Sequence, residues 1–141
     1  MSRVGSIGRE SSFRVIDPLY LLDSNICIYV LGGLSAPARA RIEQYAPGQV
    51  VTSAVAYAEV LRGLPKSPVA KSKADAFFAV VRVLPFDKDA ARQYLTIPFR
   101  RASYDRLIAA HALHLGLTFV TNDLRSFKNV PGLKVENWTR Q

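Results

Sequence analysis

Short apolar runs alternate along this chain with longer segments in which apolar residues recur every three or four positions. Short runs of this kind are typical of buried strands, and the longer periodic segments are typical of amphipathic helices. Strands are therefore predicted over residues 19–22, 49–52, 83–86, 118–121 and 133–137. Strands that alternate with helices predict an α/β fold with a central, mainly parallel sheet.

The predicted helices are bounded by residues that commonly start or end a helix. Ser53 and Asp87 each stand before a helical segment and can accept hydrogen bonds from its first N–H groups. Gly116 follows a third segment, where a glycine commonly ends a helix. Helices are predicted over residues 25–31, 37–45, 54–64, 69–81, 88–95 and 105–115. Residues 1–18 lack periodicity, so we expect a flexible leader before one domain at residues 19–141.

Composition narrows the class of protein. A chain of 141 residues with 49% hydrophobic and 21% charged residues fits one soluble globular domain, and no apolar run approaches the length of a membrane span. The net charge of +8 favours a polyanionic partner such as nucleic acid, although solubility alone also explains a basic surface. Cys27 is the only cysteine, which excludes an internal disulfide and agrees with a reducing cytoplasm.

Four acidic residues stand in apolar surroundings, where a lone carboxylate is costly: Asp23, Glu59, Asp105 and Asp123. If they converge, each pair about 4 Å apart repels by roughly 4 kcal/mol at an effective dielectric of about 20. A divalent cation removes that cost, and Mg²⁺ and Mn²⁺ prefer oxygen ligands. The sequence therefore raises the hypothesis of a metal site.

The predicted topology indicates which of these acids can meet. Asp23 and Asp123 each follow directly on a predicted strand, and Asp105 starts a helix, so all three are expected at the carboxyl edge of the sheet. Glu59 lies about two turns inside its helix and reaches this edge only if that helix face lines it. Taken singly, each acid also has an ordinary explanation as a helix cap, a turn residue or part of a solvated face.

The segments around the four acids occur in a recognisable order. They are Tyr20-Leu-Leu-Asp-Ser-Asn25, Ala58-Glu-Val-Leu-Arg-Gly63, Tyr104-Asp-Arg-Leu-Ile-Ala-Ala-His-Ala-Leu113 and Thr118-Phe-Val-Thr-Asn-Asp123. Together with the ending Glu136-Asn137-Trp138, they resemble the PIN-domain family in its VapC toxin branch, over nearly the whole domain.

The resemblance implies a three-layer α/β/α fold and a Mg²⁺- or Mn²⁺-dependent ribonuclease that is neutralised by a cognate VapB-like antitoxin and forms a homodimer. It implies that the same four acids are the catalytic and metal-binding residues. Small polar residues are expected to support them: Ser24, Asn25 and Thr121.

RNA would be held by basic residues near the acidic segments and by an aromatic ring. The candidate cations are Arg62, Arg100, Arg101, Arg106, Arg125 and Lys128. Tyr57 and Tyr104 are the candidate rings for stacking on an unpaired base. His111 and His114 share one helix, but a zinc site needs further ligands, so packing or surface roles are expected.

Other functions stay open from the sequence. A catalytically silent RNA- or protein-binding module on the same fold is the main alternative, although four acids repel RNA when no metal is bound. A phosphatase with an Asp nucleophile would need a second Asp two residues after Asp23, where Asn25 stands. A dinucleotide enzyme would need a glycine-rich loop after the first strand, and none is present.

Overall fold

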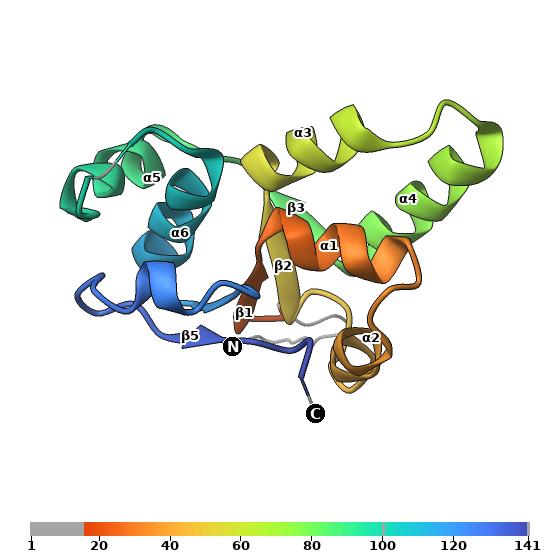
Figure 1. Ribbon diagram of the computed structural model, residues 1–141, viewed down its shortest axis with the longest axis horizontal. Coiled ribbons are helices and arrows are strands. Elements are labelled where there is room, and N and C mark those ends of the chain that lie inside the picture. Colours follow the sequence, from red (N-terminus) through yellow and green to blue (C-terminus); the bar gives the residue numbers. More distant parts are fainter. Residues whose placement is uncertain (1–15, 100, 141) are drawn as a thin grey trace, which may run out of the picture.

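A five-stranded, entirely parallel sheet forms the centre of the molecule (Figure 1). The computed structural model describes residues 16–99 and 101–140, so most of the predicted leader and Arg100 lie outside the described residues. The strand order is β3-β2-β1-β4-β5. The strands are β1 (Tyr20–Leu22), β2 (Val50–Ser53), β3 (Arg82–Leu84), β4 (Thr118–Val120) and β5 (Val135–Glu136). The predicted parallel α/β sheet is confirmed.

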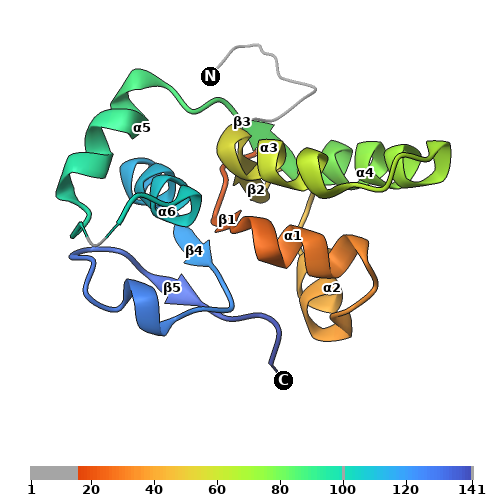
Figure 2. The same ribbon diagram turned by 45° about the horizontal axis from the view of Figure 1, so that its top comes forward.

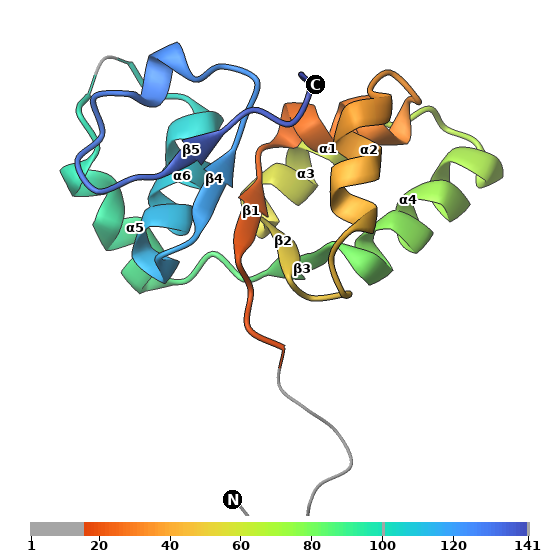
Figure 3. The ribbon, with the colours of Figure 1, turned by 90° about the horizontal axis from the view of Figure 1, so that it is seen from below.

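Helices cover both faces of this sheet, which gives three layers. They are α1 (Ser24–Leu31), α2 (Ala36–Glu43), α3 (Ala54–Gly63), α4 (Pro68–Val80), α5 (Lys88–Gln93) and α6 (Tyr104–Leu115), with short 3₁₀ turns η1 (Tyr94–Thr96) and η2 (Arg125–Phe127). Figure 1 shows α5 and α6 on one side of the strands and α1, α2 and α4 on the other. Turned views show α6 between α5 and the sheet (Figure 2) and β5 outermost beside β4 (Figure 3).

Alternation along β1 explains the two layers of core. Leu21 and Leu22 are both fully buried, and because successive side chains of a strand point to opposite faces, they enter different cores. Leu21 packs with α6 and β4 residues such as Ile108 and Phe119, whereas Leu22 packs with α1 and α2. Trp138 joins the second core with 2% of its surface exposed.

The predicted caps are confirmed at their residues. Ser53 Oγ accepts a hydrogen bond from the Val55 N–H at 3.2 Å, and Asp87 Oδ1 accepts one from the Ala90 N–H at 2.9 Å. Gly116 ends α6 in the left-handed region, with φ of 72°. These caps fix where α3 and α5 start and where α6 ends, and so they fix the phase of each helix against the sheet.

Element boundaries differ from prediction where a proline intervenes. The strand predicted over residues 83–86 ends at Leu84, because Pro85 has no N–H to donate to a ladder. The helix predicted over residues 88–95 ends at Gln93 and tightens into η1. Ile97 is extended because it precedes Pro98. In the described part of the chain, none of the helices is long and apolar enough to cross a membrane.

Candidate active site

Asp23 is a buried carboxylate at the carboxyl end of the central strand. It follows β1, caps α1, and is only 3% exposed. Its Oδ1 accepts from the Ser24 N–H at 2.8 Å, and its Oδ2 accepts from the Thr121 hydroxyl at 3.0 Å. Burial raises its pKa to about 7, and the negative charges of Asp105 and Glu59 add to this rise, while the two hydrogen bonds oppose it.

Glu59 has a buried carboxylate oxygen, Oε1, that lacks a hydrogen-bond donor among the described residues. Burial raises the pKa of Glu59, the charge of Asp105 raises it further, and the nearby Ser24 side chain lowers it. A buried carboxylate oxygen without a donor is costly, so this position favours a cation or a proton.

Asp105 is the acid that connects the other two. It lies in the first turn of α6, where the Ser103 hydroxyl donates to its Oδ1. Its negative charge raises the pKa of both Asp23 and Glu59, so it lies close enough to act on both. The structure therefore brings three carboxylates from β1, α3 and α6 into one electrostatic cluster at the carboxyl edge of the sheet.

Asp123 stands at the rim of this cluster. It is exposed, and its carboxylate accepts from the Ser126 N–H at 3.3 Å and from the Ser126 hydroxyl at 2.6 Å. Its own N–H donates to Thr121 Oγ1 at 3.1 Å, and that hydroxyl donates to Asp23. Thr121 thus links the two acids, which accords with its expected supporting role. Among the other supporting residues, Ser24 is buried beside Asp23 and Asn25 is exposed on α1.

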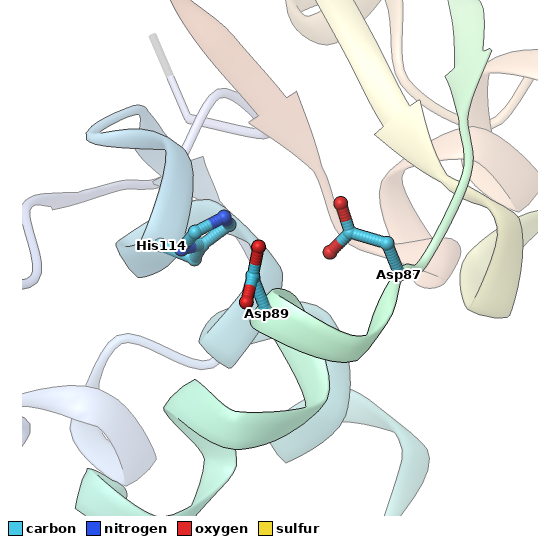
Figure 4. Close-up of side chains that lie close together, drawn as sticks. All are labelled: Asp87, Asp89 and His114. Carbon is cyan, nitrogen blue, oxygen red and sulfur yellow. The ribbon is translucent and has the colours of Figure 1, made fainter.

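Asp23, Glu59 and Asp105 lie within each other's electrostatic influence without closing into a tight ligand set, and the Asp123 carboxylate is held apart by Ser126. Within residues 16–99 and 101–140, no three of these four carboxylates bring their oxygens within 4.8 Å of one another. The group that does so is Asp87, Asp89 and His114, all exposed, which the sequence did not indicate as a group (Figure 4). Figure 4 shows Asp89 directed toward His114, with Asp87 at the start of the same helix.

The hydrogen bonds of this second group account for its geometry. Asp87 caps α5 through Ala90, and the interaction with Ala90 contributes most to lowering the pKa of Asp87. Asp89 Oδ1 accepts from the Arg92 guanidinium at 2.9 Å. Exposed carboxylates with such partners need no cation, so the start of α5 accounts for Asp87 and Asp89, and His114 comes from the neighbouring helix α6.

The donor chemistry of Asp23, Glu59 and Asp105 fits a hard divalent cation. All their potential ligands are carboxylate oxygens, which Mg²⁺ and Mn²⁺ prefer. The Oε1 of Glu59 is buried without a donor among the described residues, and burial raises the pKa of Asp23 to about 7, so both carboxyl groups ionise only at a cost. A bound cation would supply the missing compensation.

The structure separates the candidate RNA-binding cations. Exposed positions are Arg62, Arg101, Arg125 and Lys128. The prediction that Arg106 is available to RNA is corrected by the structure. Arg106 is 5% exposed, and its guanidinium donates to the Pro98 carbonyl at 2.9 Å and the Ser126 carbonyl at 3.4 Å. It braces two loops and does not face solvent. The sequence signal for its burial is its place one turn before the apolar, buried Ala109 and Ala110, which puts Arg106 on the buried face of α6.

A family comparison accounts for the order of these acids. The PIN-domain model matches residues 20–133, which spans every acid of the cluster. This chain belongs to the PIN-domain family. The family fold explains why strand ends and helix starts at one edge of a parallel sheet carry the acidic side chains, and the resemblance drawn from the four segments is confirmed.

Relatives of this PIN domain place it beside the VapC branch. It is 32% identical over 130 residues to the tRNA(fMet)-specific endonuclease VapC of Shigella flexneri, covering 85% of this chain and 98% of that protein. It is 29% identical to ribonuclease VapC2 of Rickettsia felis, covering 86% and 99% of the two chains. The solved VapBC2 complex of Rickettsia felis bound to a promoter DNA fragment has a TM-score of 0.74 at 28% identity, covering 85% and 98%. The fold is therefore that of VapC-type PIN domains.

Proposed function

We propose that this protein is a metal-dependent endoribonuclease and the toxin of a type II toxin–antitoxin module. Its VapC relatives are named as ribonucleases or as a tRNA(fMet)-specific endonuclease. The observation in this chain that supports the activity most directly is the buried Glu59 Oε1, which lies without a donor among the described residues and in the field of Asp105. A bound cation would compensate the charge of this carboxylate.

The proposed metal-binding residues are Asp23, Glu59, Asp105 and Asp123, with Mg²⁺ or Mn²⁺ as the ion. When bound, the ion supplies positive charge that acidifies a water molecule and stabilises charge developing on the phosphodiester. The protein's part is to hold the carboxylates ready. Thr121 and the Ser24 N–H orient both oxygens of Asp23, Ser103 orients Asp105, and Ser126 orients Asp123.

RNA is the proposed substrate, held by exposed cations around the acidic cluster. Arg62, Arg101, Arg125 and Lys128 are exposed and make no ion pair within the described part of the chain, so their charge is available to phosphates. Such contacts give affinity without sequence preference. Cations around an acidic centre can hold a polyanion over carboxylates that would otherwise repel it.

The proposed partners are a VapB-like antitoxin and a second copy of this chain. Several solved relatives are VapBC complexes, including one from Salmonella typhimurium bound to DNA.

The proposed site of action is the cytoplasm, which agrees with the lone Cys27. Its thiol is buried, and desolvation raises its pKa to about 12, so the thiol is unreactive.

The test is RNA cleavage by protein purified free of antitoxin. Wild type is expected to cut RNA with Mg²⁺ or Mn²⁺ and to stop in EDTA, and Asp23→Asn is expected to be inactive. Asp75→Asn is the matched control, because Asp75 is an exposed acid on α4 paired only with Lys71. Cleavage that persists in EDTA or in Asp23→Asn overturns the metal mechanism, and a wild type inactive with metal favours a silent RNA- or protein-binding module.

A further inference from the structure

A groove between α3 and α6 runs up to the acidic cluster. It has a volume of about 790 Å³ and is lined by Ala54, Val55, Ala58, Glu59, Arg62, Tyr104 and Leu107. Figure 1 shows the starts of α3 and α6 facing one another above the strands. One wall contains Glu59, and the other begins at Tyr104, one residue before Asp105, so a substrate in the groove lies beside the acidic cluster.

The two walls differ in chemistry. On α3, Glu59 and Arg62 lie three residues apart and therefore on one helix face, with Ala54, Val55 and Ala58 leaving room beside them. Arg62 is exposed and has no ion pair among the residues described. On α6, Tyr104 presents an aromatic ring that is 62% exposed. A cation facing a ring across small side chains matches the phosphate and the base of a single-stranded nucleotide.

The groove also decides between the two candidate tyrosines. Tyr57 packs edge-on against Phe78, with ring centroids 4.8 Å apart and planes at 81°, and it borders a different hollow beside Asp75 and Arg82. Tyr104 has no aromatic partner among the described residues and lines the groove that contains Glu59. An exposed ring beside an acidic site has a large apolar area available for a base.

We infer that Tyr104 stacks on an unpaired base of the RNA next to the phosphate that is cut, while Arg62 contacts a neighbouring phosphate across the groove. This inference rests on the proposed ribonuclease function and adds which residues hold the substrate. The phenol hydroxyl is not needed for stacking, so the ring alone carries the effect. Single-stranded RNA is the occupant, because a paired base has no free face to offer.

The experiment measures binding, in Mg²⁺, of a short single-stranded RNA analogue whose methylenephosphonate linkages cannot be hydrolysed, so that binding is measured without cleavage. Tyr104→Ala is expected to bind about 5- to 150-fold more weakly, the range of one lost base–aromatic stack, and Tyr104→Phe is expected to bind like wild type. Phe99→Ala is the matched control, since Phe99 is 72% exposed but does not line the groove. Arg62→Gln should reduce the salt slope of binding by about 0.7.

A second RNA with one abasic position separates stacking from a structural effect. If Tyr104 stacks, the abasic position at the groove makes wild type and Tyr104→Ala bind equally, whereas a structural defect weakens both RNAs alike. Equal binding of intact RNA by wild type and Tyr104→Ala overturns the inference. It is also overturned if Tyr104→Ala changes the oligomeric state of the protein and leaves its affinity for RNA unchanged. Wild type that binds RNA through Tyr104 yet never cleaves it contradicts the ribonuclease function alone, and wild type that binds no RNA contradicts both.

Discussion

Replacing Asp23 by Asn should stabilise the metal-free protein at alkaline pH while abolishing cleavage. Asp23 is 3% exposed, and burial raises its pKa from the usual 3.8 to about 7. Because the folded protein binds this proton more tightly than the unfolded chain, the contribution of Asp23 to stability is complete below about pH 4 and is lost as the pH rises through about 7. Above that pH the buried charge works against folding.

The magnitude follows from the two pKa values. A difference between 3.8 and about 7 corresponds to about 4 kcal/mol, at roughly 1.4 kcal/mol for each pH unit. An Asn side chain still accepts from Ser24, but it presents an amide to Thr121 in place of an oxygen, which costs about 1 kcal/mol. The expected net gain is about 3 kcal/mol, or roughly 6–12 °C in Tm for a domain of this size.

The assay is thermal and urea unfolding of wild type and Asp23→Asn in EDTA between pH 4 and pH 8. The gain should be largest at pH 8 and shrink as the pH falls toward 4, where Asp23 is protonated in the folded protein and partly protonated in the unfolded chain. Asp75→Asn, at an exposed ion pair, should change stability by less than about 0.5 kcal/mol at every pH. A loss of stability in Asp23→Asn at pH 8, or a gain independent of pH, refutes the reasoning.

Three further perturbations test the scaffold. Gly116→Ala should lower the free energy of unfolding in urea by about 1 kcal/mol, because Gly116 has φ of 72°. Gly63→Ala should leave that free energy unchanged or raise it, because Gly63 ends α3 with open space around it. Equal effects of the two substitutions would contradict this. Trp138→Ala should cost about 3–5 kcal/mol, since Trp138 is 2% exposed and donates to Glu136 at 2.9 Å, and a cost below about 1 kcal/mol would contradict its place in the core. Burial lowers the pKa of His111, so the midpoint of its NMR titration should lie below 6.5. Neutral His111 favours the folded state, and the protein should lose this stability as the pH falls. A midpoint above 6.5 would contradict this.

Much of the site could be predicted from the sequence, because the strands and the residues at their ends could be predicted. Short apolar runs predict β1 and β4, with Asp23 and Asp123 after their ends. The helix that precedes β4 must start at the same edge of the parallel sheet, which places Asp105. Glu59 was not placed by this logic, since its direction depends on the rotation of α3 about its own axis. The field of Asp105 at Glu59 now supplies that placement.

Arg106 shows what the sequence could not resolve. An arginine next to Asp105 at a helix start has the character of a surface residue, yet its acceptors are backbone carbonyls of Pro98 and Ser126, distant in sequence. Such acceptors become visible only when the loops are positioned. The grouping of Asp87, Asp89 and His114 has the same origin, because α5 and α6 pack side by side only in the folded chain.

The central claim is that the acids at the carboxyl edge of the sheet hold the metal, and Mn²⁺ binding tests it most directly. Wild-type protein should bind Mn²⁺ in electron paramagnetic resonance or calorimetric titration, Glu59→Gln should bind it at least about tenfold more weakly, and Asp87→Asn should bind it like wild type. Binding that survives in Glu59→Gln and is lost in Asp87→Asn would contradict the account and move the metal to the start of α5.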